Sequence, residues 1–288
     1  MRESPVPKRV FPALLLSLTM SLASTSASAE PEYASTETRE VIERMVEAHG
    51  GLERWQAAPS IRFDNVMFMN IAGPQQLPWW ASHEVIEQGG RRAYQEWPLD
   101  QAMLAYDGER VWSQNWKRGN MPVFMTHFFY YFVNLPWLTQ DDGVILGEPG
   151  RYTWPGTDRE LISIEMRYAE APTVGKTARD YYVLFIDPET YRLRAYQYAI
   201  GYGPMLDLMG VPADRPLFGP MWRLITRDVE VDGLVFPASF RTMPEPDGKM
   251  IAGSHLILNY AIDQPFDASR VEPPADAVFD DSIDERRR

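Results

Sequence analysis

Histidine is scarce in this sequence and cysteine is absent, so the residues most often used for metal binding and nucleophilic chemistry are few and lie far apart. The chain has no cysteine and only four histidines, and their spacing matches no metal-ligand pattern. These histidines are His49, His83, His127 and His255. His83-Glu84 begins the H-E-x-x-H motif of zinc proteases, but Glu87 stands where the second histidine is needed. We therefore expect no metal, no cofactor and no catalytic residue.

Other catalytic and nucleotide-binding motifs are incomplete. No G-x-S-x-G nucleophile elbow is present. Residues 175–177 read Gly-Lys-Thr like the end of a P-loop, but Glu170 stands where the first glycine belongs. Gly201-x-Gly203 is followed by Leu206 in place of a third glycine. The adjacent carboxylates at 141–142 and 280–281 are expected to be solvated charges rather than a facing acid–base pair.

His127 leaves one chemical alternative open. It is the one polar group of note within an aromatic segment, residues 121–138. An ordinary hydrogen-bonded histidine and a contact to a ligand headgroup both fit this position. A hydrolase would need His127 together with an acidic partner such as Asp180. A structural protein of an envelope complex, which would bury segment 121–138 against a protein partner, is the other alternative.

Apolar side chains exceed what an ordinary core requires. Segment 121–138 contains four Phe, two Tyr and one Trp, Trp79 and Trp80 follow Pro78, and the chain has 14 Met. A filled core is the usual meaning of such residues, yet methionine also suits a cavity for a ligand of variable shape. The sequence favours a cavity that binds a lipid or hydrophobic small molecule. The expected ligand-binding residues are Trp79, Trp80, Phe124, His127, Phe128, Tyr131, Trp137, Met205 and Met209.

The first 29 residues have the features of a secretory signal peptide. Arg2, Lys8 and Arg9 make a positive start, an apolar run from 10 to 23 follows, and Ala27-Ser28-Ala29 forms a small-residue cleavage site. The run is shorter than the roughly 20 residues that span a bilayer. We expect cleavage after Ala29, a periplasmic protein and no transmembrane anchor afterwards.

Charge and cysteine content narrow the class of partner. Removal of residues 1–29 takes away three basic residues and one acidic residue, which changes the net charge from −12 to −14 over 259 residues. Nucleic acid is therefore not an expected partner, because its phosphates require lysine and arginine. Without disulfides, an exported chain must be stabilised by its core, and this length is sufficient for one.

Periodicity predicts one amphipathic helix followed by a mainly β, α+β domain. Ser35 and Thr36 are candidate N-caps, apolar residues at helical spacing follow, and Gly50-Gly51 supplies a left-handed stop. Residues 52–55 should add a short turn. Strands are expected near 61–71, 80–87, 91–97, 101–106, 109–116, 158–168, 179–187, 191–200, 221–231, 234–242 and 250–260.

Turn chemistry between the predicted strands favours antiparallel pairing. Gly89-Gly90, Asp107-Gly108, Asp187-Pro188 and Asp232-Gly233 connect neighbouring segments, and parallel strands would need long crossovers. We expect one domain over residues 30–279, a large curved antiparallel sheet forming an unclosed barrel around a few helices. Residues 280–288 are expected to be a disordered tail.

Two segments lack the alternating apolar and polar pattern of the predicted strands. Segment 121–138 predicts a helix between Pro122 and Pro136 that is apolar on every face and must be covered on every face. Residues 201–222 form a Gly/Pro-rich stretch with many apolar side chains, and long loops of this kind are usually functional.

Several of these segments resemble the periplasmic lipoprotein-carrier (LolA/LolB-like) superfamily, and most closely its outer-membrane lipoprotein-sorting-like relatives. They are EAHGGLERWQ (47–56), AYDGERVW (105–112), LPWLTQDDGVIL (135–146), ARDYYVLFIDPETYRL (178–193) and VEVDGLVFPASF (229–240). The resemblance implies an unclosed barrel whose apolar interior receives acyl chains. It also implies that His49-Gly50-Gly51 ends the helix packed against the sheet and that Met121–Leu138 is a helical lid. Carriage or sensing in the cell envelope is the expected role.

The export signal makes a direct prediction. Protein recovered from the envelope of its host should begin at Glu30, because the small residues at 27 and 29 define the cleavage site. Intact-mass spectrometry checks this, and a chain that retains residues 1–29 would contradict it.

Overall fold

The computed structural model describes residues 30–70, 79–119, 122–170 and 177–282. The predicted signal peptide lies outside the described residues. The described helices are α1 (Thr36–Ala48), α2 (Leu52–Gln56), α3 (Pro122–Leu138), α4 (Gly203–Leu208) and the short 3-10 helix η1 (Ala268–Val271).

The strands of the described chain belong to one 15-stranded sheet. They are β1 (Glu32–Tyr33), β2 (Ser60–Met69), β3 (Trp79–Glu87), β4 (Ala93–Trp97), β5 (Ala102–Tyr106), β6 (Val111–Gln114), β7 (Val144–Leu146), β8 (Gly150–Thr153), β9 (Glu160–Tyr168), β10 (Tyr181–Ile186), β11 (Leu193–Ile200), β12 (Phe218–Val231), β13 (Leu234–Met243), β14 (Gly253–Ala261) and β15 (Val278–Phe279).

The sheet is an unclosed antiparallel barrel, as the sequence predicted. Its order is β1-β7-β9-β10-β11-β12-β13-β14-β2-β3-β4-β5-β6-β15, with β8 paired to β9, so β1 and β15 are separate ends. The eleven predicted strands are all present. The sequence missed β1, β7, β8 and β15, which have two to four residues each and therefore show no periodicity. The β1–β7 pair is parallel, unlike the antiparallel pairs of the rest of the sheet.

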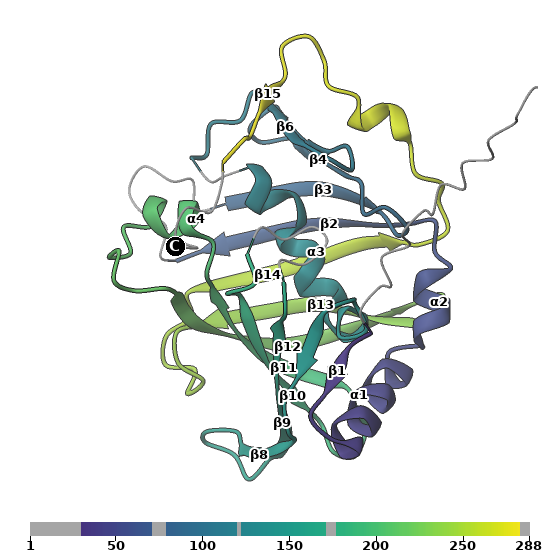
Figure 1. The fold of residues 1–288 in the computed structure, drawn as a ribbon, viewed down its shortest axis with the longest axis vertical. Coiled ribbons are helices and arrows are strands. Elements are labelled where there is room, and N and C mark those ends of the chain that lie inside the picture. Colours follow the sequence, from purple (N-terminus) through teal and green to yellow (C-terminus); the bar gives the residue numbers. More distant parts are fainter. Residues whose placement is uncertain (1–29, 71–78, 120–121, 171–176, 283–288) are drawn as a thin grey trace, which may run out of the picture.

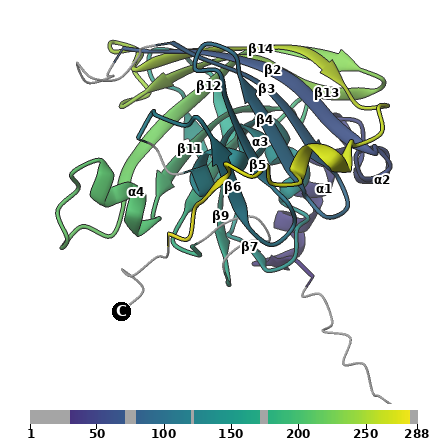
Figure 2. The same cartoon turned by 90° about the horizontal axis from the view of Figure 1, so that it is seen from above.

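Helix α3 lies in the concavity of the curved sheet (Figures 1 and 2). Thirteen of its seventeen residues are buried, as expected for a helix that is apolar on every face. The expected end of the helix at Pro136 is corrected: the helix continues through Pro136 to Leu138. Met121 lies outside the described residues.

The C-terminal end of α3 is locked by aromatic and polar contacts. Trp137 stacks on Trp55 of α2 with ring centroids 5.9 Å apart, and its Nε1 donates to the carbonyl oxygen of Gly51 at 3.1 Å. Trp55 Nε1 in turn donates to Asn134 Oδ1 at 2.8 Å. The helix turn at Pro136-Trp137 is therefore part of the packed core.

The carboxylate pairs at 141–142 and 280–281 were expected to be solvated. One residue of each pair instead makes a polar contact at an end of α3. Asp141 accepts two hydrogen bonds from Arg91, at 2.9 and 2.6 Å, just beyond the end of the helix. Asp280 Oδ2 accepts from the backbone N–H of Val123 at 2.8 Å and so satisfies a free donor at the helix start. Ser282 Oγ, three residues beyond the expected domain end at 279, lies 2.8 Å from the Tyr202 hydroxyl. Residues 283–288 lie outside the described residues.

The C-terminal segment covers part of the convex face of the sheet. Val271 of η1 packs on a cluster with Val85, Tyr94 and Ala105, and its carbonyl oxygen accepts from Trp112 Nε1 at 2.8 Å. Figure 2 shows this segment crossing beside β4 and β6. Burial on both faces suits β5, whose five residues AMLAY are all apolar.

Helix α1 begins and ends as predicted. Ser35 is its N-cap and accepts from the backbone N–H of Thr38 at 3.2 Å. Gly50 and Gly51 both have positive φ, 101° and 85°. His49 forms the C-cap, where its Nδ1 donates to the Met45 carbonyl oxygen at 2.8 Å, but burial lowers its pKa to about 4. The His49 imidazole is therefore neutral at physiological pH.

The backbone at Gly50 lies closer to a neighbouring hairpin than the end of the helix alone requires. A Cβ placed there would lie 2.1 Å from the carbonyl oxygen of Gly233 in the β12–β13 hairpin. Gly156 also has positive φ, 77°, but a Cβ there meets nothing within 4 Å. The two glycines separate backbone strain from steric overlap.

Gly50→Ala should therefore destabilise the protein more than Gly156→Ala. Both variants incur the left-handed backbone penalty, and Gly50→Ala must also displace the hairpin, which we expect to add at least about 1 kcal/mol. Urea denaturation of the two variants measures the difference. Equal free energies of unfolding would show that the hairpin does not constrain Gly50.

Candidate functional site

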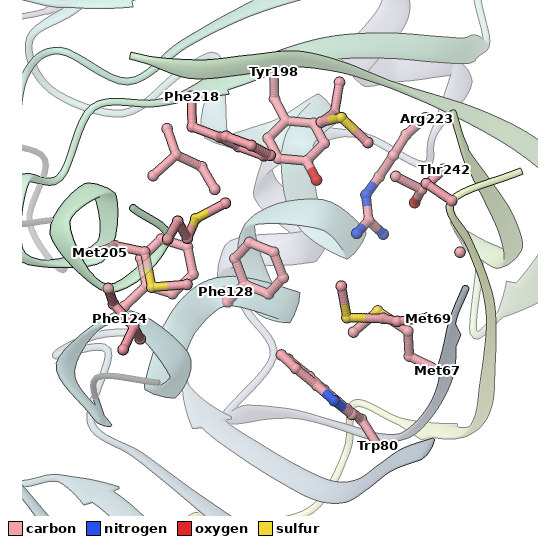
Figure 3. A pocket seen from close by; sticks show the side chains of 16 residues that line it. Met67, Met69, Trp80, Phe124, Phe128, Tyr198, Met205, Phe218, Arg223 and Thr242 are labelled. Atoms are coloured by element: carbon pink, nitrogen blue, oxygen red, sulfur yellow. The ribbon is translucent and has the colours of Figure 1, made fainter. Parts of the chain in front are cut away.

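A cavity of about 430 Å³ lies between α3, the α4 region and the concave face of the sheet (Figure 3). This volume falls within the range of roughly 300–1,000 Å³ that is usual for small-molecule sites. Its described lining consists of Met67, Met69, Trp80, Phe124, Phe128, Tyr198, Ile200, Met205, Leu208, Met209, Phe218, Met221, Arg223, Thr242, Ala252 and Gly253.

The strand register brings distant residues onto one wall of the cavity. Directly opposed residues in antiparallel strands point to the same face. One such row across β12, β13, β14 and β2 consists of Arg223, Thr242, Gly253 and Met69. A neighbouring row across β14, β2 and β3 consists of His255, Met67 and Trp80. Gly253 has no side chain and leaves room within the first row.

The opposite walls come from the two segments that interrupt the strand rhythm. Phe124 and Phe128 of α3 face the cavity and pack against each other, with ring centroids 4.8 Å apart. Met205 and Leu208 of α4, with Met209 at its C-cap, lie across from them (Figure 3). Five methionines are among the described residues that line the cavity, so its shape can adapt because methionine changes rotamer at low cost.

Arg223 is the one charged side chain among the described residues of the lining. The side chain is 1% exposed, and its guanidinium points into the cavity (Figure 3). Its Cζ lies 3.7 Å from the ring centroid of Phe132, and Nη1 donates to His255 Nδ1 at 3.2 Å. Burial and the nearby guanidinium lower the pKa of His255 well below its ordinary value, so this imidazole is neutral.

Five of the nine predicted ligand-binding residues lie in this cavity. They are Trp80, Phe124, Phe128, Met205 and Met209. Trp79, His127, Tyr131 and Trp137 are not among its lining residues. Trp79 follows the strand alternation to the opposite face, where it is 54% exposed and contacts Phe68.

The other three residues outside the cavity belong to the packing around α3. His127 Nε2 donates to the carbonyl oxygen of Arg91 at 2.9 Å, and the ring meets Tyr106 edge-on. Tyr131 packs at the edge of the main core, and Trp137 lies in the Trp55 stack. His127 therefore does not face the cavity as a headgroup contact would.

Sequence reasoning missed the sheet wall of the site. Met67 and Met69 alternate on β2, and Met221 and Arg223 alternate on β12. This alternation shows that each pair shares a face, but not that the two faces meet. An arginine in a strand normally points to solvent, so Arg223 carried no signal of burial.

A buried carboxyl anchors the helix turn that bears Phe124 and Phe128. Gln95 Nε2 lies 2.9 Å from the carbonyl oxygen of Met125, 3.1 Å from that of Thr126 and 3.0 Å from Glu84 Oε2. Glu84 Oε1 accepts from Ser82 Oγ at 2.7 Å. Burial raises the pKa of Glu84 to about 8, so this carboxyl is protonated at neutral pH.

The described residues contain no group of three or more histidine, aspartate or glutamate side chains that could hold a metal ion. Among the same residues, no helix is long and apolar enough to cross a membrane. The geometry of the site supports binding through apolar contact with one directional polar corner.

No protein-family model and no curated protein matches this sequence. Solved structures with a similar fold include a DUF1329 family protein from Desulfovibrio piger, with TM-score 0.49, 12% identity and coverage of 82% of this chain and 97% of that chain. A LolA superfamily protein from Nitrosomonas europaea has TM-score 0.47, 7% identity and coverage of 82% and 97%. An outer membrane lipoprotein-sorting protein domain from Vibrio parahaemolyticus has TM-score 0.43, 8% identity and coverage of 86% and 94%.

Two of these structures carry family names that the sequence resemblance predicted, the LolA superfamily and the outer membrane lipoprotein-sorting domain. The identities are too low to transfer a function, so the function is argued from the cavity of this chain.

The raised pKa of Glu84 predicts a pH-dependent effect of Glu84→Gln. The folded protein holds the proton up to about pH 8, whereas the unfolded chain releases it above about pH 4.5, so this group lowers stability progressively between those values. The variant lacks this loss, and its free energy of unfolding relative to wild type should rise by at least about 1 kcal/mol from pH 5 to pH 8.

Urea denaturation at both pH values measures this difference. Glu230→Gln, which removes an exposed carboxyl on β12, should show no such rise. A flat difference for Glu84→Gln would mean that the carboxyl is ionised in the folded state.

Proposed function

We propose that this protein binds an acyl chain or another hydrophobic small molecule in the cavity, for carriage or sensing in the cell envelope. The observation that carries the proposal is the 430 Å³ cavity with its methionine and aromatic lining. The predicted export signal supports an envelope location.

The volume sets the size of the ligand. At roughly 30 Å³ for each non-hydrogen atom of a condensed phase such as water, the cavity holds roughly 14 atoms. Each buried methylene contributes about 0.8 kcal/mol before the entropic cost of binding. A single medium-length chain therefore supplies enough free energy for binding without any directional chemistry.

The two alternatives lack a supporting observation. A hydrolase would direct His127 toward a substrate, but Nε2 of this residue donates to Arg91 and the side chain is 4% exposed. An envelope-complex protein would cover α3 with a partner, but thirteen residues of α3 are buried within this chain. An unidentified envelope protein that delivers or receives the ligand is compatible with the proposal.

Native mass spectrometry of protein purified from its host tests the proposal directly. Extra mass from one small hydrophobic molecule is the expected result. A protein that co-purifies in place of such a molecule would favour the assembly alternative.

Met205→Asp should weaken uptake of a fluorescent fatty acid at least tenfold, about 1.4 kcal/mol, because it places a carboxylate in the apolar wall. Met250→Asp changes an exposed methionine outside the cavity lining and is the matched control. Fluorescence titration measures both affinities, and circular dichroism verifies the folded sheet. Met209→Asp, at a more exposed lining position, replaces Met205→Asp if that variant unfolds. Unchanged uptake in the folded cavity variant would contradict the proposal.

A further inference from the structure

The nearly complete burial of Arg223 is unusual for a charged side chain. Charged side chains are almost never buried this fully unless they are paired with an opposite charge. Among the described residues, no carboxylate oxygen lies within 4.0 Å of the Arg223 nitrogens. The chain carries a net charge of −12, yet none of its described acidic residues pairs with this cation.

Aromatic rings hold the guanidinium but do not neutralise it. Phe132 lies beneath it, and the ring centroids of Tyr198 and Phe240 are each 5.5 Å from Cζ. These contacts fix the plane of the guanidinium by cation–π attraction. The N–H groups remain directed past the rings, and Figure 3 shows the end of the side chain facing the space beside Phe128 and Met69.

Three buried polar atoms at and beside this corner of the cavity have no hydrogen-bond partner among the described residues. They are Arg223 Nε, Thr242 Oγ1 and, next to the lining, His255 Nε2. Because His255 Nδ1 accepts from Arg223, the proton of the neutral imidazole resides on Nε2 and makes it a donor. Arg223 is a donor only, and the Thr242 hydroxyl can donate as well. The corner therefore offers donors and a positive charge, to which an anionic oxygen is complementary.

We propose that the ligand is a single-chain amphiphile whose anionic oxygen headgroup pairs with Arg223, while its chain occupies the methionine-lined part of the cavity. This inference rests on the proposed function and specifies the ligand of the same site. A cavity of about 430 Å³ is of small-molecule size, which suits a single alkyl chain. A carboxylate and a phosphate monoester share the chemistry that Arg223 recognises.

The test compares ligands that share one chain and differ in headgroup. Dodecanoate, dodecyl phosphate, dodecanol and dodecylammonium compete with the uncharged fluorophore Nile red for the protein that begins at Glu30. We expect dodecanoate or dodecyl phosphate to bind at least tenfold more tightly than dodecanol, about 1.4 kcal/mol, and dodecylammonium to bind most weakly. The stronger of the two anions identifies the headgroup class.

Two arginine variants assign the preference to the cavity. Arg223→Met should abolish the preference for the anion and leave dodecanol binding within about threefold of wild type, because methionine preserves the apolar wall. Arg241→Met removes the same charge from an exposed position on β13 and should retain the preference. If Arg223→Met does not fold, Arg223→Gln provides the same comparison.

The outcomes separate this inference from the proposed function. Equal binding of all four ligands overturns the inference and leaves the hydrophobic site intact. Failure of every ligand to displace Nile red overturns the proposed function itself. A preference for the anion that survives in Arg223→Met places the headgroup elsewhere and also overturns the inference.

Discussion

The requirement to cover α3 on every side organises this protein. A helix with four Phe, two Tyr and one Trp cannot leave a face in water. The curved sheet supplies cover from one side, and α1 and α2 supply it from another. The polar contacts at the two ends of the helix come from segments far away in sequence, Asp280 at its start and Arg91 near its end. The sheet therefore does not close on itself, and α3 occupies its interior.

The same arrangement accounts for the cavity. Close packing around α3 is complete at Trp137, where rings stack, but the Phe124 and Phe128 turn faces methionines and Gly253 across free volume. Because Gly253 has no side chain, its row on the sheet leaves space opposite this helix turn. Methionines around such a space can adapt to a ligand or partly fill the space in its absence.

Buried polar groups in this core fall into two kinds. Glu84, Gln95 and Asn134 satisfy one another or backbone groups of α3, so their role is to fix the helix. Arg223 donates to His255, lies opposite Tyr196 on β11, and otherwise meets aromatic faces and the cavity, with no carboxylate partner among the described residues. The helix-fixing network is complete without Arg223, which is why its charge is better explained by a ligand than by the fold.

Local sequence determined the elements of the structure, since periodicity, caps and turn residues act over a few positions. The limits of α1 could be predicted from Ser35 and the Gly50-Gly51 stop, and the hairpins from the Asp-Gly turns. The composition of segment 121–138 predicted a helix that must be buried on every face. The shortest strands could not be foreseen because two or three residues have no period. The site was decided by tertiary structure: Met69 and Arg223 share a row only because β14 pairs with β2 and β13 with β12. Long-range register sets which face of a strand is enclosed, and this turned Arg223 inward and Trp79 outward. His127 lies on α3, and the packing of that helix directs its ring toward the Arg91 carbonyl oxygen and away from the cavity.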